Sequence, residues 1–192
     1  MAYVCADSGI PVFGQKGCSI HVQEFIRSLL QKNVQICLFT TRLGNEIPSD
    51  FQGVKVYHLP TIPKVERAVR EKIALSINPD LELELSLAQP FDFVYERYSL
   101  WSYSGMEYAQ KMGIPGILEV NAPLILEQEK HRGLVNREQA EAVARKVFQA
   151  ATVIIAVSRE IKDYVSQYVT DKNKIKVIPR PFKFELHQYL TD

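Results

Sequence analysis

One segment near the start of the chain carries residue types expected of a ligand-binding loop. Residues 7–21 read DSGIPVFGQKGCSIH, with Gly14 and Gly17 placed just before a stretch of helical periodicity. Glycines at this position let a ligand approach the backbone, where free amide groups and the helix dipole favour an anion or a sugar hydroxyl. The spacing matches neither G-x-G-x-x-G nor a P-loop that ends in G-K-[ST]. On spacing alone, a ligand-binding loop and a flexible connector are equally good interpretations.

Polar side chains also gather where later strands are predicted to end. Glu96 and Arg97 directly follow one strand, and we expect them to form either a structural ion pair or a substrate clamp. Glu119 and Asn121 flank the end of the next strand, where they could bind sugar hydroxyls or tie down the following loop. His21 lies off the apolar stripe of its helix, which favours a surface or supporting role. No Ser/His/Asp or Cys/His nucleophile set can be assembled with these residues.

The elements that must position these side chains alternate between short apolar runs and segments of helical period. The predicted strands cover 3–6, 34–40, 54–58, 91–95, 116–120, 153–157 and 175–178. Apolar residues at i, i+3, i+4 and i+7 predict helices over 20–30, 65–77, 101–112, 140–151 and 158–169. Residues 81–85 alternate like a strand, but Asn78 followed by Pro79 favours a second short helix there. We expect Ser19 and Ser158 to cap helix starts, and Asn33 and Gly113 to end helices in left-handed conformations.

This alternation predicts an α/β fold. We expect a Rossmann-like, doubly wound, mainly parallel sheet of about seven strands with helices on both faces. In such sheets ligands bind beyond the carboxyl ends of the strands, where loops and helix N-termini converge. No fixed repeat, low-complexity tract or internal linker interrupts the pattern, so we expect one domain.

Composition excludes several classes of protein. The 192 residues are 46% apolar and 23% charged, with a formal net charge of +1, which argues against a nucleic-acid-binding protein. Cys5, Cys18 and Cys37 form neither a CxxC pair nor a cluster with histidine, so we expect no metal site and no disulfide framework. Without a signal peptide or a spanning helix, we expect a cytoplasmic protein.

Four segments together resemble the N-terminal, acceptor-side domain of the GT-B-fold, family 4 retaining glycosyltransferases. These segments are 9–22, 91–101, 118–124, and 156–158 followed by 176–179. The resemblance implies two Rossmann-like domains that face each other across a cleft. The N-terminal domain binds mainly the acceptor, and the C-terminal domain binds a nucleotide-sugar substrate. It further implies transfer with retention of anomeric configuration, without a metal ion or a tightly bound cofactor.

The resemblance also assigns candidate site residues. The residues that it places in the cleft between acceptor and donor are Gly14, Gln15, Lys16, Gly17, Ser19, Glu96, Arg97, Tyr98 and Ser158. Many family members carry a histidine after the fifth strand, where this chain reads Glu119-Val120-Asn121. The catalytic candidates are therefore Glu119, Asn121 and His21.

The end of the chain bears on domain organisation and activity. Family members continue Pro-Asn-Gly into the second domain, whereas this chain reads Pro179-Arg180-Pro181 and stops at Asp192. We expect residues 1–182 to form the glycosyltransferase N-terminal domain and 183–192 to begin an interdomain linker or tail. Such a half is expected to be inactive without a donor-binding domain. The alternative is a non-catalytic Rossmann-like binding or scaffold module derived from such an enzyme.

The expected partners follow from this interpretation. They are a sugar acceptor and a donor-side domain or second chain, with self-association as the alternative. Self-association would use an exposed apolar wall formed by Phe13, Phe182 and Phe184. Four basic residues lie close together in the sequence: Lys64, Arg67, Arg70 and Lys72. They are compatible with peripheral contact with the inner membrane face, although a solvated helix face is the favoured explanation. A nicotinamide-dependent oxidoreductase is disfavoured, because the first βα turn lacks the dinucleotide glycine spacing.

Overall fold

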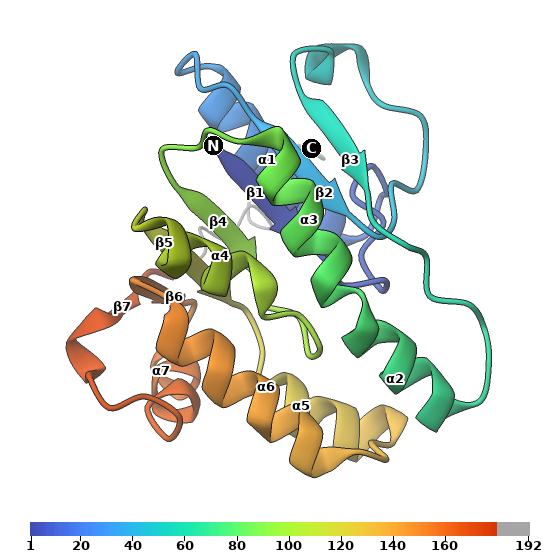
Figure 1. The fold of residues 1–192 in the computed structure, drawn as a ribbon, viewed down its shortest axis with the longest axis vertical. Helices are drawn as coiled ribbons and strands as arrows, with labels where there is room; N and C mark the ends of the chain where they lie inside the picture. The colour runs from blue at the N-terminus through green and yellow to red at the C-terminus, as the bar shows by residue number, and fades with distance from the viewer. Residues whose placement is uncertain (180–192) are drawn as a thin grey trace, which may run out of the picture.

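A single parallel sheet organises the chain in the computed structural model, which describes residues 1–179. Its seven strands lie in the order β3-β2-β1-β4-β5-β6-β7 (Figure 1). The strands are β1 Ala2–Cys5, β2 Cys37–Thr40, β3 Lys55–His58, β4 Val94–Arg97, β5 Gly116–Val120, β6 Val153–Ala156 and β7 Ile175–Val177. Every neighbouring pair is parallel. Because the chain builds outward from β1 in one direction and from β4 in the other, the strand order reverses between these two strands.

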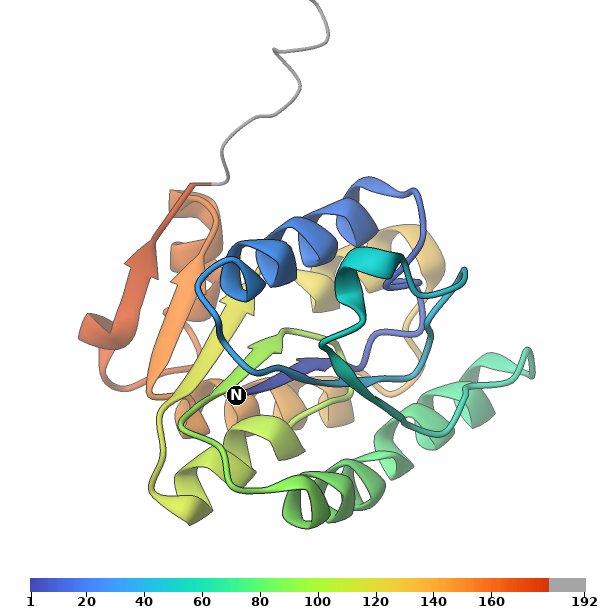
Figure 2. The same cartoon turned by 90° about the horizontal axis from the view of Figure 1, so that it is seen from above.

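Helices cover both faces of the sheet. They are α1 Gly17–Leu30, α2 Arg67–Ser76, α3 Asn78–Ala88, α4 Ser104–Met112, α5 Leu124–Glu127, α6 Arg137–Ala150 and α7 Arg159–Val165. Single-turn helices are η1 Ser49–Phe51, η2 Gln128–Arg132 and η3 Lys172–Lys174. Figure 2 shows α1 on one face and α3 and α4 on the opposite face. The predicted doubly wound, Rossmann-like sheet with helices on both faces is thus confirmed.

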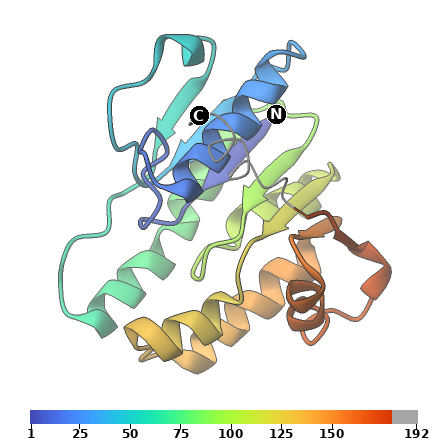
Figure 3. The ribbon, with the colours of Figure 1, turned by 180° about the vertical axis from the view of Figure 1, so that it is seen from behind.

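Two apolar layers sandwich the sheet, and Figure 3 shows α1 crossing in front of it. The α1 layer contains Tyr3, Cys5, Val22, Ile26, Leu38 and Phe51. The opposite layer contains Val4, Phe39, Leu81, Leu85, Met106, Leu118, Val147 and Phe148. Successive strand residues point to opposite faces, so a strand covered on both sides must be apolar throughout. All four residues of β1 are buried for this reason.

Several local signals in the sequence correspond to observed turns and caps. Gly113 and Asn33 adopt left-handed conformations, with φ of 67° and 57°. Ser158 caps α7, because its Oγ accepts a hydrogen bond from the Ile161 N–H at 3.4 Å. Residues 78–88 form a helix with Pro79 in its first turn, so the expectation of a helix here rather than a strand is confirmed.

Two local expectations are wrong. Ser19 does not cap α1, because the helix already begins at Gly17 and Ser19 is buried within its first turn. Strand β4 starts later than predicted, so Glu96 and Arg97 are its last two residues rather than the loop after it. Phe91 supplied the apolar signal for the earlier start, but it lies before the strand and packs edge-on against Phe39 at 6.1 Å between ring centroids.

None of the helices formed by residues 1–179 is long and apolar enough to cross a bilayer. The expected boundary at 182 and the expected linker 183–192 lie outside the described residues, as do Arg180, Phe182 and Phe184.

Candidate functional site

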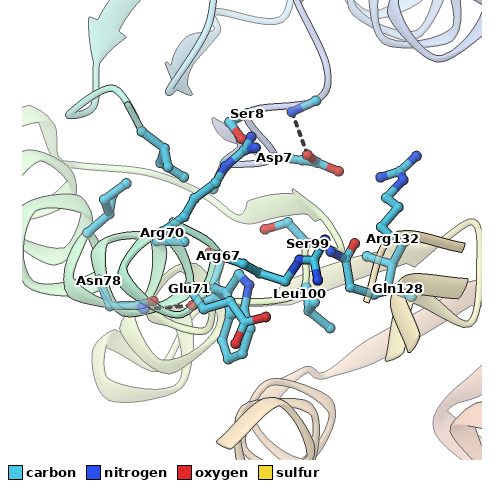
Figure 4. Close-up of a pocket in the computed structure, with 18 of the residues that line it drawn as sticks. Asp7, Ser8, Arg67, Arg70, Glu71, Asn78, Ser99, Leu100, Gln128 and Arg132 are labelled. Atoms are coloured by element: carbon cyan, nitrogen blue, oxygen red, sulfur yellow. Dashed lines mark hydrogen bonds between the residues drawn. The ribbon is translucent and has the colours of Figure 1, made fainter. Parts of the chain in front are cut away.

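A pocket of about 610 Å³ opens at the carboxyl edge of the sheet, where the strand order reverses between β1 and β4. We call it the β1/β4 pocket (Figure 4). Its walls come from residues 6–9 after β1, residues 99–102 after β4, helices α2 and α3, and the turn formed by α5 and η2. Open parallel sheets place their ligand sites at this point, because loops diverge there in opposite directions.

The polar lining of the β1/β4 pocket comes from segments far apart in the sequence. The polar and charged lining residues are Asp7, Ser8, Arg67, Arg70, Glu71, Asn78, Ser99, Ser102, Gln128 and Arg132. The side chain of Asn78 holds two of these segments together, because its Oδ1 accepts the N–H groups of Tyr103 and Ser104 at 2.8 and 3.1 Å. Its Nδ2 donates to the carbonyl oxygen of Trp101 at 2.8 Å. The loop after β4 is therefore fixed to the start of α3.

The glycine loop, residues 7–17, lies beside the same edge and is held by hydrogen bonds. Nε2 of Gln23 donates to the carbonyl oxygens of Val12 and Gly14 at 2.8 and 2.9 Å. The Phe13 N–H donates to the Leu43 carbonyl oxygen at 2.7 Å. These bonds connect the loop both to α1 and to the segment after β2, so the loop is not a free connector.

Gly14 and Gly17 of this loop differ in their surroundings. A Cβ at Gly14 would lie 2.7 Å from Cγ of Pro11 and 3.0 Å from its carbonyl oxygen, so only glycine fits there without displacement. A Cβ at Gly17 would meet no heavy atom within 4 Å. Gln15, Lys16 and Gly17 are exposed at the start of α1. The loop therefore presents an open backbone at a helix N-terminus.

Two of the three catalytic candidates contact each other. Nε2 of His21 lies 2.6 Å from Oε1 of Glu119, linking α1 to the end of β5. The Glu119 side chain is 4% exposed and the His21 side chain 24%, so the pair reaches solvent through the imidazole. His21 is thus the partner of a buried carboxylate, whereas the sequence indicated only a surface or supporting role. Asn121, the third candidate, is half-buried in the loop after β5.

Arg97 lies next to this pair on the sheet. It pairs with Glu119 in the register of β4 and β5, which puts both side chains on the α1 face. Arg97 is 7% exposed, and its Nη1 has no hydrogen-bond partner within residues 1–179. Cys5 is buried nearby, and burial raises the pKa of its thiol to about 12, with Arg97 opposing the shift. Cys5 is therefore a neutral core thiol.

Glu96 points to the opposite face of the sheet from Arg97, so the ion pair, one of the two alternatives for these residues, does not form. The Glu96 carboxylate is fully buried and accepts a hydrogen bond from Oγ of Ser102 at 2.5 Å. Burial raises the pKa of Glu96 to about 7, and the bonds from Ser102 and the Met106 N–H oppose the shift. A Cβ at Gly105 would collide with the Glu96 carboxylate, which explains the glycine in α4. Glu96 thus lies in the core between β4 and α4.

The remaining predicted cleft residues lie in different surroundings. Tyr98 is 4% exposed and packs against Phe148 at 4.8 Å between ring centroids, inside the core. Ser19 is buried, and its Oγ has no hydrogen-bond partner in the described part of the chain. Ser158 is half-buried at the end of β6 as the cap of α7. Phe13 is buried against Phe51, so the expectation that it belongs to an exposed apolar wall is wrong.

Sequence reasoning missed the charged side of the β1/β4 pocket. In the sequence Arg67 and Arg70 belong to a basic helix face, Trp101 ends the family-like segment 91–101, and no motif marks Arg132. The spacing of Arg67 and Arg70 places them on one face of a helix, which was a usable signal. Nothing in the sequence indicates that Arg132 lies beside them. Among residues 1–179, no group of three or more His, Cys, Asp or Glu side chains could hold a metal ion.

The seven-stranded parallel sheet is a Rossmann-like domain of the kind that forms one half of a GT-B fold. Residues 16–185 match the model of Glycosyltransferase Family 4, and the chain belongs to this family. A search of curated proteins finds no significant match.

Solved structures share the fold at low sequence identity. Sucrose-phosphate synthase from Thermosynechococcus elongatus is 12% identical with a TM-score of 0.64. The match covers 96% of this chain and 49% of the synthase chain. The lipopolysaccharide outer core galactosyltransferase WaaB is 16% identical with a TM-score of 0.57, covering 94% and 45%. HepE from Anabaena, solved with UDP-glucose, is 12% identical with a TM-score of 0.54, covering 96% and 44%. The chain therefore spans about half the length of these proteins.

Proposed function

We propose that this chain is the acceptor-binding half of a glycosyltransferase that moves a sugar from a nucleotide-sugar donor with retention of configuration. The observation that carries the proposal is the β1/β4 pocket, which lies at the strand-order reversal of a family 4 chain. A pocket of this size falls within the range of about 300–1,000 Å³ that holds small ligands.

The donor is proposed to bind mainly to a second domain, supplied in the same protein or by a second chain. Two observations support this division. The chain covers about half of each of the three solved structures named above, and one of them, HepE, was solved with UDP-glucose. The reacting atoms would then meet between the two domains, with the carboxyl edge of this sheet on the acceptor side.

The glycine loop is proposed to face the phosphates of the donor. Its exposed part, Gln15 to Gly17, leads into α1, a helix of 14 residues that begins at Gly17. The unpaired N–H groups and the dipole at a helix N-terminus favour negative charge. The absence of atoms around the Gly17 Cβ position leaves room for a ligand to approach the backbone.

The pair formed by His21 and Glu119 is proposed to act beside the reacting sugar. Glu119 is buried, and its 2.6 Å bond to His21 links it to the one member of the pair that is open to solvent. The contact fixes the orientation of both side chains before the reaction. They would therefore not need to reorganise when charge develops on the sugar during transfer. Asn121 follows on the same strand end and is proposed to bind a sugar hydroxyl.

The proposal is tested by measuring sugar transfer from labelled nucleotide sugars to a panel of acceptors. The assay compares this chain alone, a donor-binding domain of a family 4 enzyme alone, and the two fused, which we call the two-domain form. Transfer by the two-domain form only is the expected result. Turnover by the chain alone would show that it is not a half enzyme. A two-domain form that folds but never transfers would favour a non-catalytic binding module.

A further inference from the structure

Three arginine side chains converge on the β1/β4 pocket (Figure 4). Arg67 and Arg70 come from α2, where a spacing of three residues places them on one helix face. Arg132 comes from η2, the turn that follows β5 and α5. Within residues 1–179, none of the three forms a salt bridge. Two separate segments therefore bring arginines that are free of salt bridges to one pocket.

The two acidic residues of the pocket, Asp7 and Glu71, offset the charge of the three arginines only in part, and neither forms a salt bridge with them. Both carboxylate oxygens of Glu71 are used: Oε1 accepts the Val135 N–H at 3.0 Å, and Oε2 accepts the Asn136 N–H and Nδ2, each at 2.8 Å. Glu71 is 5% exposed and fastens α2 to the start of α6. Asp7 accepts the Gly9 N–H at 2.7 Å and is the remaining acid of the lining. The lining therefore keeps a surplus of positive charge.

The backbone at Gly133 shapes the path of Arg67. Gly133 has a φ of 76°, and a Cβ added there would collide with Nη1 of Arg67. The guanidinium thus lies directly against the glycine. Figure 4 shows Arg67 reaching into the pocket and Arg70 extending toward Ser8. A glycine at this position leaves space for a cationic side chain in the pocket.

Apolar groups line the deeper part of the same pocket. Ile77 and Leu81 are buried and Trp101 is partly buried, and all three line the cavity. A ligand that fits must therefore offer an anionic group to the arginines and a less polar body, such as a sugar ring or a lipid chain, to this surface.

We propose that the β1/β4 pocket recognises a phosphate group on the acceptor, bound by Arg67, Arg70 and Arg132. Guanidinium groups bind phosphate through paired N–H donors in a fixed planar geometry, which a compact ammonium group cannot reproduce. That the ligand is the acceptor rests on the proposed function, whereas the phosphate site stands on the arginines themselves. A soluble sugar phosphate and a lipid phosphate headgroup present the same chemistry.

Trp101 provides a direct readout, because it is the one tryptophan of the 192 residues and lines the pocket. The full chain is titrated with glucose 6-phosphate, with glucose, and with phosphatidylcholine vesicles that contain or lack phosphatidic acid, while Trp101 fluorescence is recorded. We expect a saturable change with a phosphate-bearing probe, none with glucose, and weaker binding as salt is added. A response to glucose 6-phosphate indicates a soluble source, and a response only to phosphatidic acid vesicles indicates a lipid source.

Matched variants separate the site from general surface charge. Arg67→Gln and Arg70→Gln are each expected to weaken binding by about tenfold, the effect of one lost bond to a charged group. Lys72→Gln, on the exposed side of α2 outside the pocket, is expected to leave binding unchanged. The proposal is overturned if neither phosphate probe gives a response, if glucose and glucose 6-phosphate respond alike, or if Lys72→Gln weakens binding as much as Arg70→Gln. The two proposals can fail separately. If the arginine variants lose binding but the two-domain form never transfers sugar, the phosphate site stands and the proposed function is rejected.

Discussion

Oε1 of Glu119 at the end of β5 lies 2.6 Å from Nε2 of His21 in α1, across a sequence separation of 98 residues. The bond joins the helix that follows the glycine loop to the strand that precedes Asn121. A buried carboxylate costs free energy unless hydrogen bonds satisfy it, so this contact both stabilises the fold and fixes the orientation of Glu119.

Removing the imidazole should therefore destabilise the protein. His21→Leu is expected to lower the free energy of unfolding by about 1–3 kcal/mol, because it deletes a bond to a buried charged group. His21→Gln retains a donor and should lose less. Urea unfolding of both variants, alone and combined with Glu119→Gln, gives the coupling energy between the two side chains. Additive effects of His21→Leu and Glu119→Gln would show that the contact contributes nothing.

The glycine loop yields a matched pair of substitutions. Gly14→Ala should cost about 1–3 kcal/mol of stability, because its Cβ would lie 2.7 Å from Cγ of Pro11. Gly17→Ala should leave the unfolding midpoint unchanged or slightly raised, because its Cβ meets no heavy atom within 4 Å.

The same pair tests whether the loop binds the donor. If a ligand approaches the backbone at Gly17, Gly17→Ala should lower kcat/KM of the two-domain form by on the order of tenfold or more. Thermal unfolding of each variant accompanies the transfer assay. Wild-type kinetics in a stable Gly17→Ala variant would remove the loop from the proposed donor site.

Glu96 makes stability depend on pH in a defined direction. Its pKa is about 7 in the folded protein, against an ordinary value of 4.5, because the carboxyl group is buried. Its contribution to the free energy of unfolding is therefore fully present below pH 4.5 and is lost as pH rises through about 7. The full loss is about 3 kcal/mol.

The measurement compares wild type with Glu96→Gln, whose side chain does not titrate. Wild type should become less stable relative to Glu96→Gln as pH rises from 4.5 to about 7. Above that pH, the difference in unfolding free energy between the two proteins should remain constant. Because other groups titrate equally in both proteins, they cancel in the difference. A difference that is independent of pH would mean that Glu96 is ionised in the fold like an exposed carboxylate.

The sequence carried enough information for the sheet but not for the pocket. Residues 116–120 were predicted as a strand with the observed bounds, because a short apolar run between Gly113 and a polar loop has few alternatives. Arg132 could not be placed, because its position follows from tertiary bonds such as those of Glu71 to Asn136, which join residues 65 apart.

Residue type alone also does not predict where the polar residues at the end of β4 lie. Glu96 and Tyr98 are polar residues at a strand end, which predicts exposure at the ligand edge. The fold instead buries both: Ser102 donates a hydrogen bond to Oε1 of Glu96, and the ring of Phe148 covers Tyr98. Alternation along β4 sends Arg97 to the other face, so neighbouring charges in the sequence are separated by the sheet.

The most direct test of the acceptor-side assignment fills the β1/β4 pocket with a larger side chain. The Michaelis constants of the acceptor and of the nucleotide sugar are then measured in the two-domain form. Ala74 is half-buried and lines this pocket, so Ala74→Phe places a ring inside it, whereas Val69→Phe adds the same ring to the exposed side of α2. We predict that Ala74→Phe raises the acceptor KM by roughly tenfold or more and leaves the nucleotide-sugar KM unchanged, while Val69→Phe alters neither. A rise in the nucleotide-sugar KM with an unchanged acceptor KM would contradict the account, because it would place the donor rather than the acceptor in this half.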